Sequence, residues 1–215
     1  MTHHEVEKYS SGARVLHWIH MASFVVLFLT GLVLFIPALG PIAAGGWTRI
    51  AHRVGAVVFV TIPIIYLLFN WSGSWRGVAK AFTWGSADMG WLKAAPRFYF
   101  LNDEKAMPPQ DEMNSGQKLW LLIALVAGVV FAISGIIMWF GKATMPAGLL
   151  QSMVLLHDIA FIMAGVMLLV HIYLAVFHPL MTEAWGSMVS GKISAEYAKK
   201  HHGKWYEGIS RAQKD

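Results

Sequence analysis

Six histidines lie in or beside strongly apolar stretches of the chain: His17, His20, His52, His157, His171 and His178. An ionisable side chain in such a setting needs a partner and marks a functional site by default. Neutral imidazole can ligate a metal or haem iron, and it can also transfer protons. The other four histidines, His3, His4, His201 and His202, lie in polar or basic stretches and are expected to be solvated.

His157 and His171 share one apolar stretch. On a helix, their separation leaves them about 40° apart around the axis and roughly 21 Å apart along it. One helix face therefore carries two sites, near opposite sides of a hydrocarbon layer that is ~30 Å thick. This arrangement suits two haems stacked across a membrane, each of which needs one further axial ligand.

Depth in the membrane selects these further ligands. His52 is expected at the depth of His157, and His17 at the depth of His171, so the predicted pairs are His52 with His157 and His17 with His171. Side chains that project inward from facing helices commonly hold a cofactor inside a bundle. His20 remains an alternative to His17 and His178 an alternative to His171, although His178 lies beside Pro179, where the helix is expected to end.

Four apolar stretches position these histidines. They cover residues 16–36, 54–71, 118–140 and 151–177, each close to the ~20 residues that cross a bilayer as a helix. Hydrophobic residues make up 56% of the 215 positions and charged residues only 13%, which is a membrane composition. The sequence predicts an all-α integral membrane protein whose residues 1–215 form a single domain, a four-helix bundle with two b-type haems.

The positive charges indicate the orientation. Lysines and arginines are concentrated in the N-terminal tail, the middle loop and the tail 178–215, while the other two loops hold few. The positive-inside rule therefore places both termini and that tail in the cytoplasm, with the His52 end of the second helix outside. The Trp-rich loop, residues 72–113, is expected to lie along the inner membrane surface, and the last fifteen residues to be partly flexible.

Composition also excludes several functions. The chain has no cysteine, so it cannot bind an iron-sulfur cluster, form a disulfide or attach c-type haem. Its net charge of +5 comes from basic residues that flank apolar spans, where they set membrane orientation, so no nucleic-acid partner is expected.

Several segments together resemble a known family. They are Arg14 to Trp18 (RVLHW), Arg49 to Arg53 (RIAHR), Asn114 to Lys118 (NSGQK), Leu155 to His157 (LLH), His171 to Phe177 (HIYLAVF) and Lys199 to Tyr206 (KKHHGKWY). Across nearly its whole length the chain resembles the cytochrome b (gamma) subunit of membrane-bound respiratory formate dehydrogenases. This family is related to the cytochrome b subunits of nickel-iron hydrogenases.

The resemblance implies both cofactors and partners. The family's haem ligands fall on His17, His52, His157 and His171, and its quinone site on Asn114, Gly116, Gln117 and His171. Two haems b would carry electrons from an iron-sulfur subunit, served by a molybdenum or tungsten formate dehydrogenase catalytic subunit, to menaquinone or ubiquinone at the cytoplasmic side of the bacterial inner membrane. A trimer or other higher oligomer of the complex is also familiar in the family.

Other functions remain open. The same cytochrome could serve a nickel-iron hydrogenase or a thiosulfate reductase. A membrane anchor without redox activity would pack the histidines and bind no haem. The NSGQK segment has a simpler interpretation as well, in which Asn114 or Ser115 caps the third helix.

Overall fold

A computed structural model describes residues 4–103 and 105–212 of the chain. The chain divides into two compact units. We call residues 15–71 and 123–169 the bundle unit, and residues 1–14, 72–122 and 170–215 the terminal unit. The elements of each unit are described separately.

Four helices are long and apolar enough to cross a membrane, which confirms the predicted number of spans in the described part of the chain. They are α1 (Ser11–Phe35), α3 (Trp47–Phe69), α6 (Ser115–Phe140) and α7 (Ala147–Ile172), the last continued by a π-helical turn, η2 (Tyr173–Phe177). Helix α3 begins at Trp47, well before the predicted start at residue 54, so His52 lies inside the helix. A short 3-10 turn, η1 (Pro37–Leu39), and α2 (Gly40–Ala43) connect α1 to α3.

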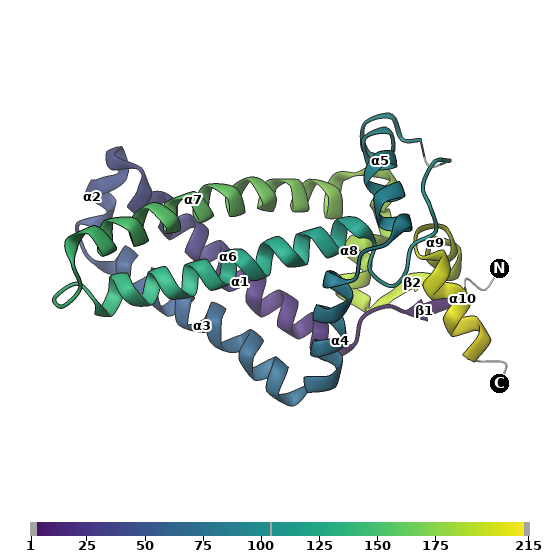
Figure 1. Ribbon diagram of the computed structural model, residues 1–215, viewed down its shortest axis with the longest axis horizontal. Coiled ribbons are helices and arrows are strands. Elements are labelled where there is room, and N and C mark those ends of the chain that lie inside the picture. Colours follow the sequence, from purple (N-terminus) through teal and green to yellow (C-terminus); the bar gives the residue numbers. More distant parts are fainter. Residues whose placement is uncertain (1–3, 104, 213–215) are drawn as a thin grey trace. The chain divides into compact units, whose positions relative to one another are not determined.

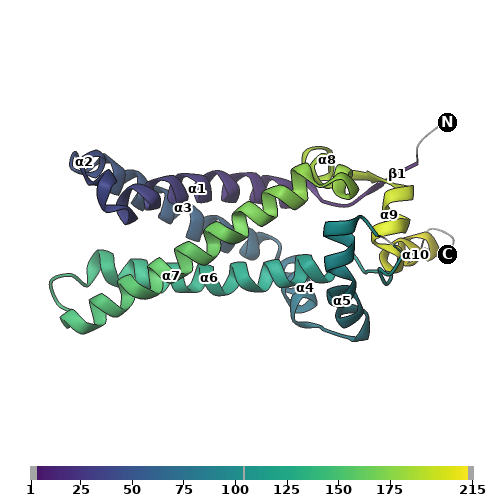
Figure 2. The ribbon, with the colours of Figure 1, turned by 90° about the horizontal axis from the view of Figure 1, so that it is seen from above.

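Small residues let the helices of the bundle unit approach one another, as membrane helices require. A methyl group on Gly55 of α3 would lie 3.3 Å from the side chains of Val26 and Leu27 on α1. One on Gly165 of α7 would lie 2.9 Å from the ring of Phe28. Both views show α6 and α7 running alongside each other in this unit (Figures 1 and 2).

The terminal unit contains structure where the sequence predicted a loop and a tail. Helices α4 (Trp71–Phe82) and α5 (Ser86–Leu101) occupy most of the Trp-rich loop. The tail contains η3 (Pro179–Met181), α8 (Thr182–Ser190), β2 (Lys192–Ser194), α9 (Ala195–His201) and α10 (Gly203–Ala212). The expectation of a partly flexible end is therefore wrong as far as residue 212, because α10 is a regular helix.

The two ends of the chain pair with each other. Strand β1 (Glu5–Glu7) lies antiparallel to β2, with Val6 opposite Ile193. These two side chains, with Tyr197 and Ala198 of α9, form a buried cluster against which Trp205, Tyr206 and Ile209 of α10 pack. Figures 1 and 2 show α9 and α10 beside the two strands. The N-terminal segment is therefore part of the core of the terminal unit.

Candidate functional site

Two of the predicted ligands meet inside the bundle unit. His52 of α3 and His157 of α7 face each other, with ring centroids 6.3 Å apart. Phe131 of α6 contacts the His157 ring edge-on at 5.0 Å. The sequence predicted this pair from depth alone, and the structure brings both side chains to one place.

A hydroxyl group holds each of these rings. The Nδ1 atom of His52 lies 2.9 Å from Oγ1 of Thr30, and that of His157 lies 2.8 Å from Oγ of Ser134. Thr30 donates its hydroxyl proton to the carbonyl of Val26 at 2.6 Å, and Ser134 donates to the carbonyl of Val130 at 2.5 Å.

The tautomer of both rings follows from these bonds. A hydroxyl has one proton to give, so each oxygen must accept a hydrogen bond from the imidazole. Nδ1 therefore carries the proton on His52 and His157, and Nε2 keeps its lone pair. Metal-bound histidines are usually held in this way, with the second ring N–H donated to a fixed acceptor.

The distance between the rings fits one iron atom. An imidazole ring has a radius of about 1.2 Å and a metal–nitrogen bond is about 2.0–2.1 Å, so two rings that would hold one metal between them would have centroids about 6.4 Å apart. The observed value is 6.3 Å. Two neutral imidazoles at this spacing could hold one haem iron between them.

The histidines of the second predicted site lie in different units. His17 and His20 of α1 belong to the bundle unit, and the Nδ1 atom of each is buried without a hydrogen-bond partner among the described residues. His20 stacks on Phe59 at 4.1 Å. His171 of α7 belongs to the terminal unit, where it stacks on Trp120 at 4.5 Å. The pairing of His17 with His171, and the choice of His17 over His20, stay predictions.

His178 has a structural role in the terminal unit. It is 2% exposed, its Nδ1 accepts a hydrogen bond from the backbone N–H of Leu180 at 3.3 Å, and its Nε2 lies 3.2 Å from the carbonyl of Tyr99. Both ring nitrogens are therefore engaged, which leaves neither for a metal.

Two histidines that were expected to be solvated differ from that expectation. His201 is half-buried and stacks on Tyr197 at 4.2 Å. His202 is buried, 4% exposed, with Nδ1 2.8 Å from the carbonyl of Asp111. Burial, and then the nearby Lys8, lower the pKa of His202 to about 3. The prediction that this residue is solvated is wrong, because it lies between α9 and α10 against Trp205 and the Asp111 backbone. His4 is exposed, and His3 lies outside the described residues.

The NSGQK segment begins helix α6 through reciprocal capping. The backbone N–H of Gln117 donates to Oδ1 of Asn114 at 2.8 Å, and the N–H of Asn114 donates to Oε1 of Gln117 at 3.0 Å. This is a capping box, which satisfies two otherwise unpaired backbone donors. The capping interpretation of Asn114 is thus confirmed. The amide nitrogen of Asn114 is a donor that a bound molecule could use. The Gln117 side chain also makes a hydrogen bond with the hydroxyl group of Tyr9, which leaves at most one N–H of its amide for a bound molecule.

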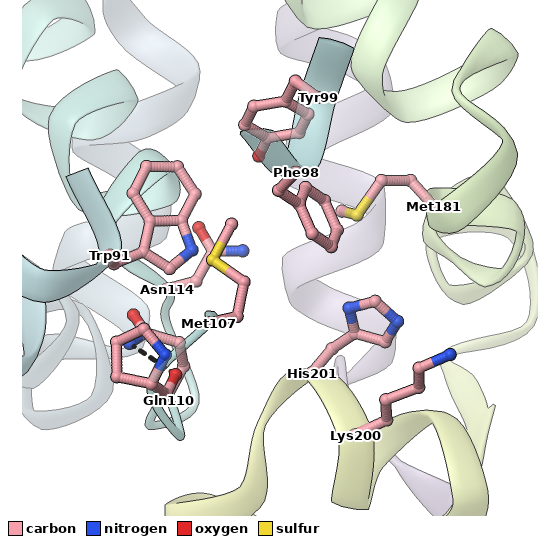
Figure 3. A pocket seen from close by; sticks show the side chains of 10 residues that line it. Trp91, Phe98, Tyr99, Met107, Gln110, Asn114, Met181, Lys200 and His201 are labelled. Carbon is pink, nitrogen blue, oxygen red and sulfur yellow. Dashed lines mark hydrogen bonds between the residues drawn. The ribbon is translucent and has the colours of Figure 1, made fainter. Parts of the chain in front are cut away.

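Gly116 has a packing role in the same segment. A methyl group on it would lie 2.7 Å from Cη2 of Trp91, so this ring of α5 covers the glycine. Asn114 lines a cavity beside Trp91, whose other walls come from α5, the following loop, η3 and α9. Figure 3 shows the Asn114 amide directed into this cavity, towards Phe98.

Sequence reasoning missed Thr30, Ser134 and Trp91. The two hydroxyl residues carried a usable signal, since polar side chains are uncommon in apolar spans and each lies at a depth that a histidine shares. Trp91 carried no signal of its own among the ten tryptophans of the chain.

The four apolar helices define a class of protein, namely a multi-pass membrane protein, and the paired imidazoles are two side chains that could hold a metal between its helices. Comparison with known proteins gives the family. The model of the prokaryotic cytochrome b561 family matches residues 8–191, and the chain belongs to that family. It is accordingly a cytochrome b of the inner membrane with b-type haem.

Curated relatives match over most of their length. The cytochrome b556(Fdn) subunit of the nitrate-inducible formate dehydrogenase of Escherichia coli is 25% identical over 209 residues, covering 93% of this chain and 89% of that protein. The formate dehydrogenase cytochrome b556 subunit of Haemophilus influenzae is 26% identical, with 97% and 86% covered. A probable Ni/Fe-hydrogenase B-type cytochrome subunit of Bradyrhizobium diazoefficiens is 27% identical, with 87% and 84% covered.

Proposed function

We propose that the chain is the membrane cytochrome b subunit of a formate dehydrogenase complex. It passes electrons from an iron-sulfur partner, through two haems b, to menaquinone or ubiquinone at the cytoplasmic side. The observation that carries this proposal is the His52–His157 pair, whose ring spacing and fixed tautomers would allow both residues to hold one haem iron. The choice of formate dehydrogenase as the partner is supported by relatives that are named as subunits of that enzyme.

Each haem, when bound, takes up and releases one electron, so two sites at different depths provide a route across the bilayer. His52 and His157 hold the outer position, and Thr30 and Ser134 fix their rings. His17 and His171 hold the inner position. His171 is favoured over His178 because both nitrogens of His178 are engaged. His20 remains the alternative to His17, since the Nδ1 atom of each ring is buried without a hydrogen-bond partner among the described residues.

Quinone is expected at the NSGQK segment. A quinone carbonyl needs hydrogen-bond donors, and capping uses only the amide oxygens of Asn114 and Gln117. Reduction also consumes protons, which the cytoplasm supplies if the basic segments face inward. Gly116 has no side chain, so the Trp91 ring can pack directly against the NSGQK segment. This role differs from the lining role that the resemblance implies.

Haem content tests the electron-transfer proposal first. A pyridine haemochrome assay on the purified full chain should give two b haems per polypeptide. A folded preparation without haem would overturn the proposal and favour a membrane anchor.

Donor identity needs a separate test. Membranes that contain the native complex should reduce the b haems on addition of formate, and His52→Ala should block this reduction. His171→Ala should remove the inner haem and abolish quinol formation. Full quinone reduction in either variant would contradict the route.

A hydrogenase cytochrome is the second candidate, favoured by the Bradyrhizobium relative. The histidine site would be the same in both cases. The two candidates differ in the electron donor, so reduction of the haems by hydrogen and not by formate would select the hydrogenase.

A further inference from the structure

A buried carboxylate lies next to the NSGQK segment in the terminal unit. Asp88, in the first turn of α5, is 7% exposed. Its Oδ1 accepts hydrogen bonds from Oγ of Ser115 at 2.7 Å and from Nζ of Lys118 at 2.9 Å. Its Oδ2 accepts from the same Nζ at 3.1 Å and from the backbone N–H of Gly85 at 2.9 Å. One side chain therefore ties the start of α5 to two residues of the motif.

Asp88 stays ionised in this position. Burial by itself would raise its pKa, but the hydrogen bonds from Lys118, Ser115 and Gly85 outweigh burial, so the pKa of Asp88 lies below its ordinary value. The Lys118 side chain is also largely buried, 12% exposed, and donates a further bond to the carbonyl of Thr83 at 2.9 Å. Removing either partner of a buried ion pair is strongly destabilising, because the charge of the other partner is then left buried and uncompensated.

The bonds to Asp88 fix the backbone around the expected quinone donors. Ser115 and Lys118 flank Gly116 and Gln117 in the sequence. Ser115 is fully buried, and both its N–H and its hydroxyl lie 3.0 Å from Oε1 of Gln110. Ser115 and Lys118 are therefore both held in place, by side chains other than Asn114 and Gln117.

Helix α5 also contacts the NSGQK segment through a second residue, Trp91. Trp91 follows Asp88 by three residues, so the two side chains project from the same side of α5. Its ring covers Gly116 and lines the cavity into which Asn114 points (Figure 3). A shift of the Asp88 end of α5 would move this ring and the Asn114 side of the cavity together.

We infer that Asp88 is a positioning residue for quinone, acting through Ser115 and Lys118 to hold the donors of Asn114 and Gln117 in place. This inference rests on the proposed function, because it assigns quinone to the NSGQK segment. It also gives a function to the Trp-rich loop, whose α5 helix becomes the support of the quinone site.

The test compares two conservative variants in the haem-loaded full chain. Asp88→Asn removes the charge at nearly constant shape. Asp111→Asn makes the same change on an exposed side chain that accepts a hydrogen bond from the neighbouring N–H of Glu112 and, among the described residues, makes no hydrogen bond to the NSGQK segment. Oxidised protein is mixed with reduced 2-methyl-1,4-naphthoquinone, and haem reduction is followed by absorbance as the quinol concentration is varied. Asp88→Asn should raise the half-saturating quinol concentration about ten- to a hundredfold, as expected for misplaced binding groups. Asp111→Asn should not change it.

A second readout separates positioning from general damage. Haem content should stay the same in Asp88→Asn, while hydrogen exchange at residues 114–118 should become faster than in the unsubstituted chain. If Asp88→Asn does not fold, Ser115→Ala removes one of the same hydrogen bonds and should raise the half-saturating concentration in the same direction. An unchanged concentration in every folded variant of this pair would overturn the inference.

The assignment of quinone to the NSGQK segment is tested separately from the role of Asp88. Asn114→Ala removes a donor that the proposal assigns to quinone. If this variant keeps the full quinol dependence while Asp88→Asn loses it, the assignment of the donors is wrong. If Asn114→Ala loses the dependence and Asp88→Asn keeps it, the site stands and the positioning role of Asp88 is wrong.

Discussion

Thr30 accepts a hydrogen bond from His52 because its own proton is already given to the carbonyl of Val26. Ser134 has the same relationship with His157 and Val130. Each hydroxyl thus sets the tautomer of a ring on another helix and directs the lone pair of Nε2 away from itself. A hydrogen bond donated by Nδ1–H also makes the imidazole a more basic ligand.

Removal of either hydroxyl should change the midpoint potential of the haem without lowering the haem content. In Thr30→Val and Ser134→Ala the ring loses its acceptor, the ligand becomes less basic, and the oxidised iron is stabilised less. The midpoint potential should rise by on the order of 20–40 mV for each variant, where 59 mV corresponds to a tenfold change for a one-electron couple. Spectroelectrochemical titration of the purified chain measures this shift.

Matched controls for these variants lie on the same helices as the histidines. Among the described residues, the hydroxyls of Thr61 on α3 and Ser152 on α7 donate to carbonyls of their own helices, those of Val57 and Gly148. Thr61→Val and Ser152→Ala should leave both potentials unchanged. Equal potentials in all four variants would show that the hydroxyls do not tune a haem ligand.

Loss of a ligand should have a larger effect than loss of its hydroxyl partner. His52→Ala and His157→Ala should each lower the haem content from two to one per polypeptide by the pyridine haemochrome assay, since an axial bond of the same site is lost in both. His4→Ala, at an exposed position, is the control and should retain both haems. Two haems in both His52→Ala and His157→Ala would exclude this pair as the ligands.

The same assay decides between His17 and His20. Both rings have an unpartnered Nδ1, and the structure treats them alike in this respect. Replacing the residue that ligates the inner haem by alanine should lower the haem content to one per polypeptide. Replacing the other histidine should leave two. We expect the loss in His17→Ala.

The sequence predicted the spans well because hydropathy over a whole helix is a strong signal. The start of α3 was misplaced because Arg49, His52 and Arg53 lower local hydropathy, although a helix tolerates them near a membrane surface. The pairing of His52 with His157 followed from depth. The hydroxyl partners and the Asp88 contacts depend on how separate helices face each other, which periodicity along one helix does not specify.

The pairing of β1 with β2 was not predictable either. Each strand has three residues, too few for an alternating pattern, and the partners come from opposite ends of the chain. The burial of His202 follows from the same long-range contacts, so its polar neighbourhood in the sequence was a poor guide.

Gly116 should not tolerate a side chain. In Gly116→Ala the new methyl group would lie 2.7 Å from the Trp91 ring, and overpacking of this kind typically costs about 1–3 kcal/mol. Gly186 of α8 provides the contrast, since a methyl group there meets nothing within 4 Å and alanine favours a helix by about 1 kcal/mol. Thermal denaturation in detergent should show a lower midpoint for Gly116→Ala and an equal or higher one for Gly186→Ala. Equal midpoints for Gly116→Ala and the unsubstituted chain would mean that Trp91 moves without cost.

His202 should make the fold of α9 and α10 sensitive to acid. Its pKa is about 3 in the folded chain, against 6.5 for an ordinary histidine, because burial and then Lys8 disfavour the charged ring. Above pH 6.5 neither state binds the proton, so His202 has no effect on stability there. As the pH falls from 6.5 towards 3, only the unfolded segment takes up the proton, and the free energy of unfolding decreases by up to about 1.4 kcal/mol per pH unit.

Hydrogen exchange of α9 and α10 at pH 7.5 and pH 5.5, corrected for intrinsic rates, measures this effect. The protection factors should fall by about tenfold between the two values, which corresponds to a loss of about 1.4 kcal/mol. His202→Gln removes the titrating ring and retains a donor for the carbonyl of Asp111, so its protection should vary much less with pH. His4→Gln replaces an exposed histidine next to β1 and should keep the full pH dependence. The same pH dependence in His202→Gln and in the unsubstituted chain would show that another group destabilises this unit in acid.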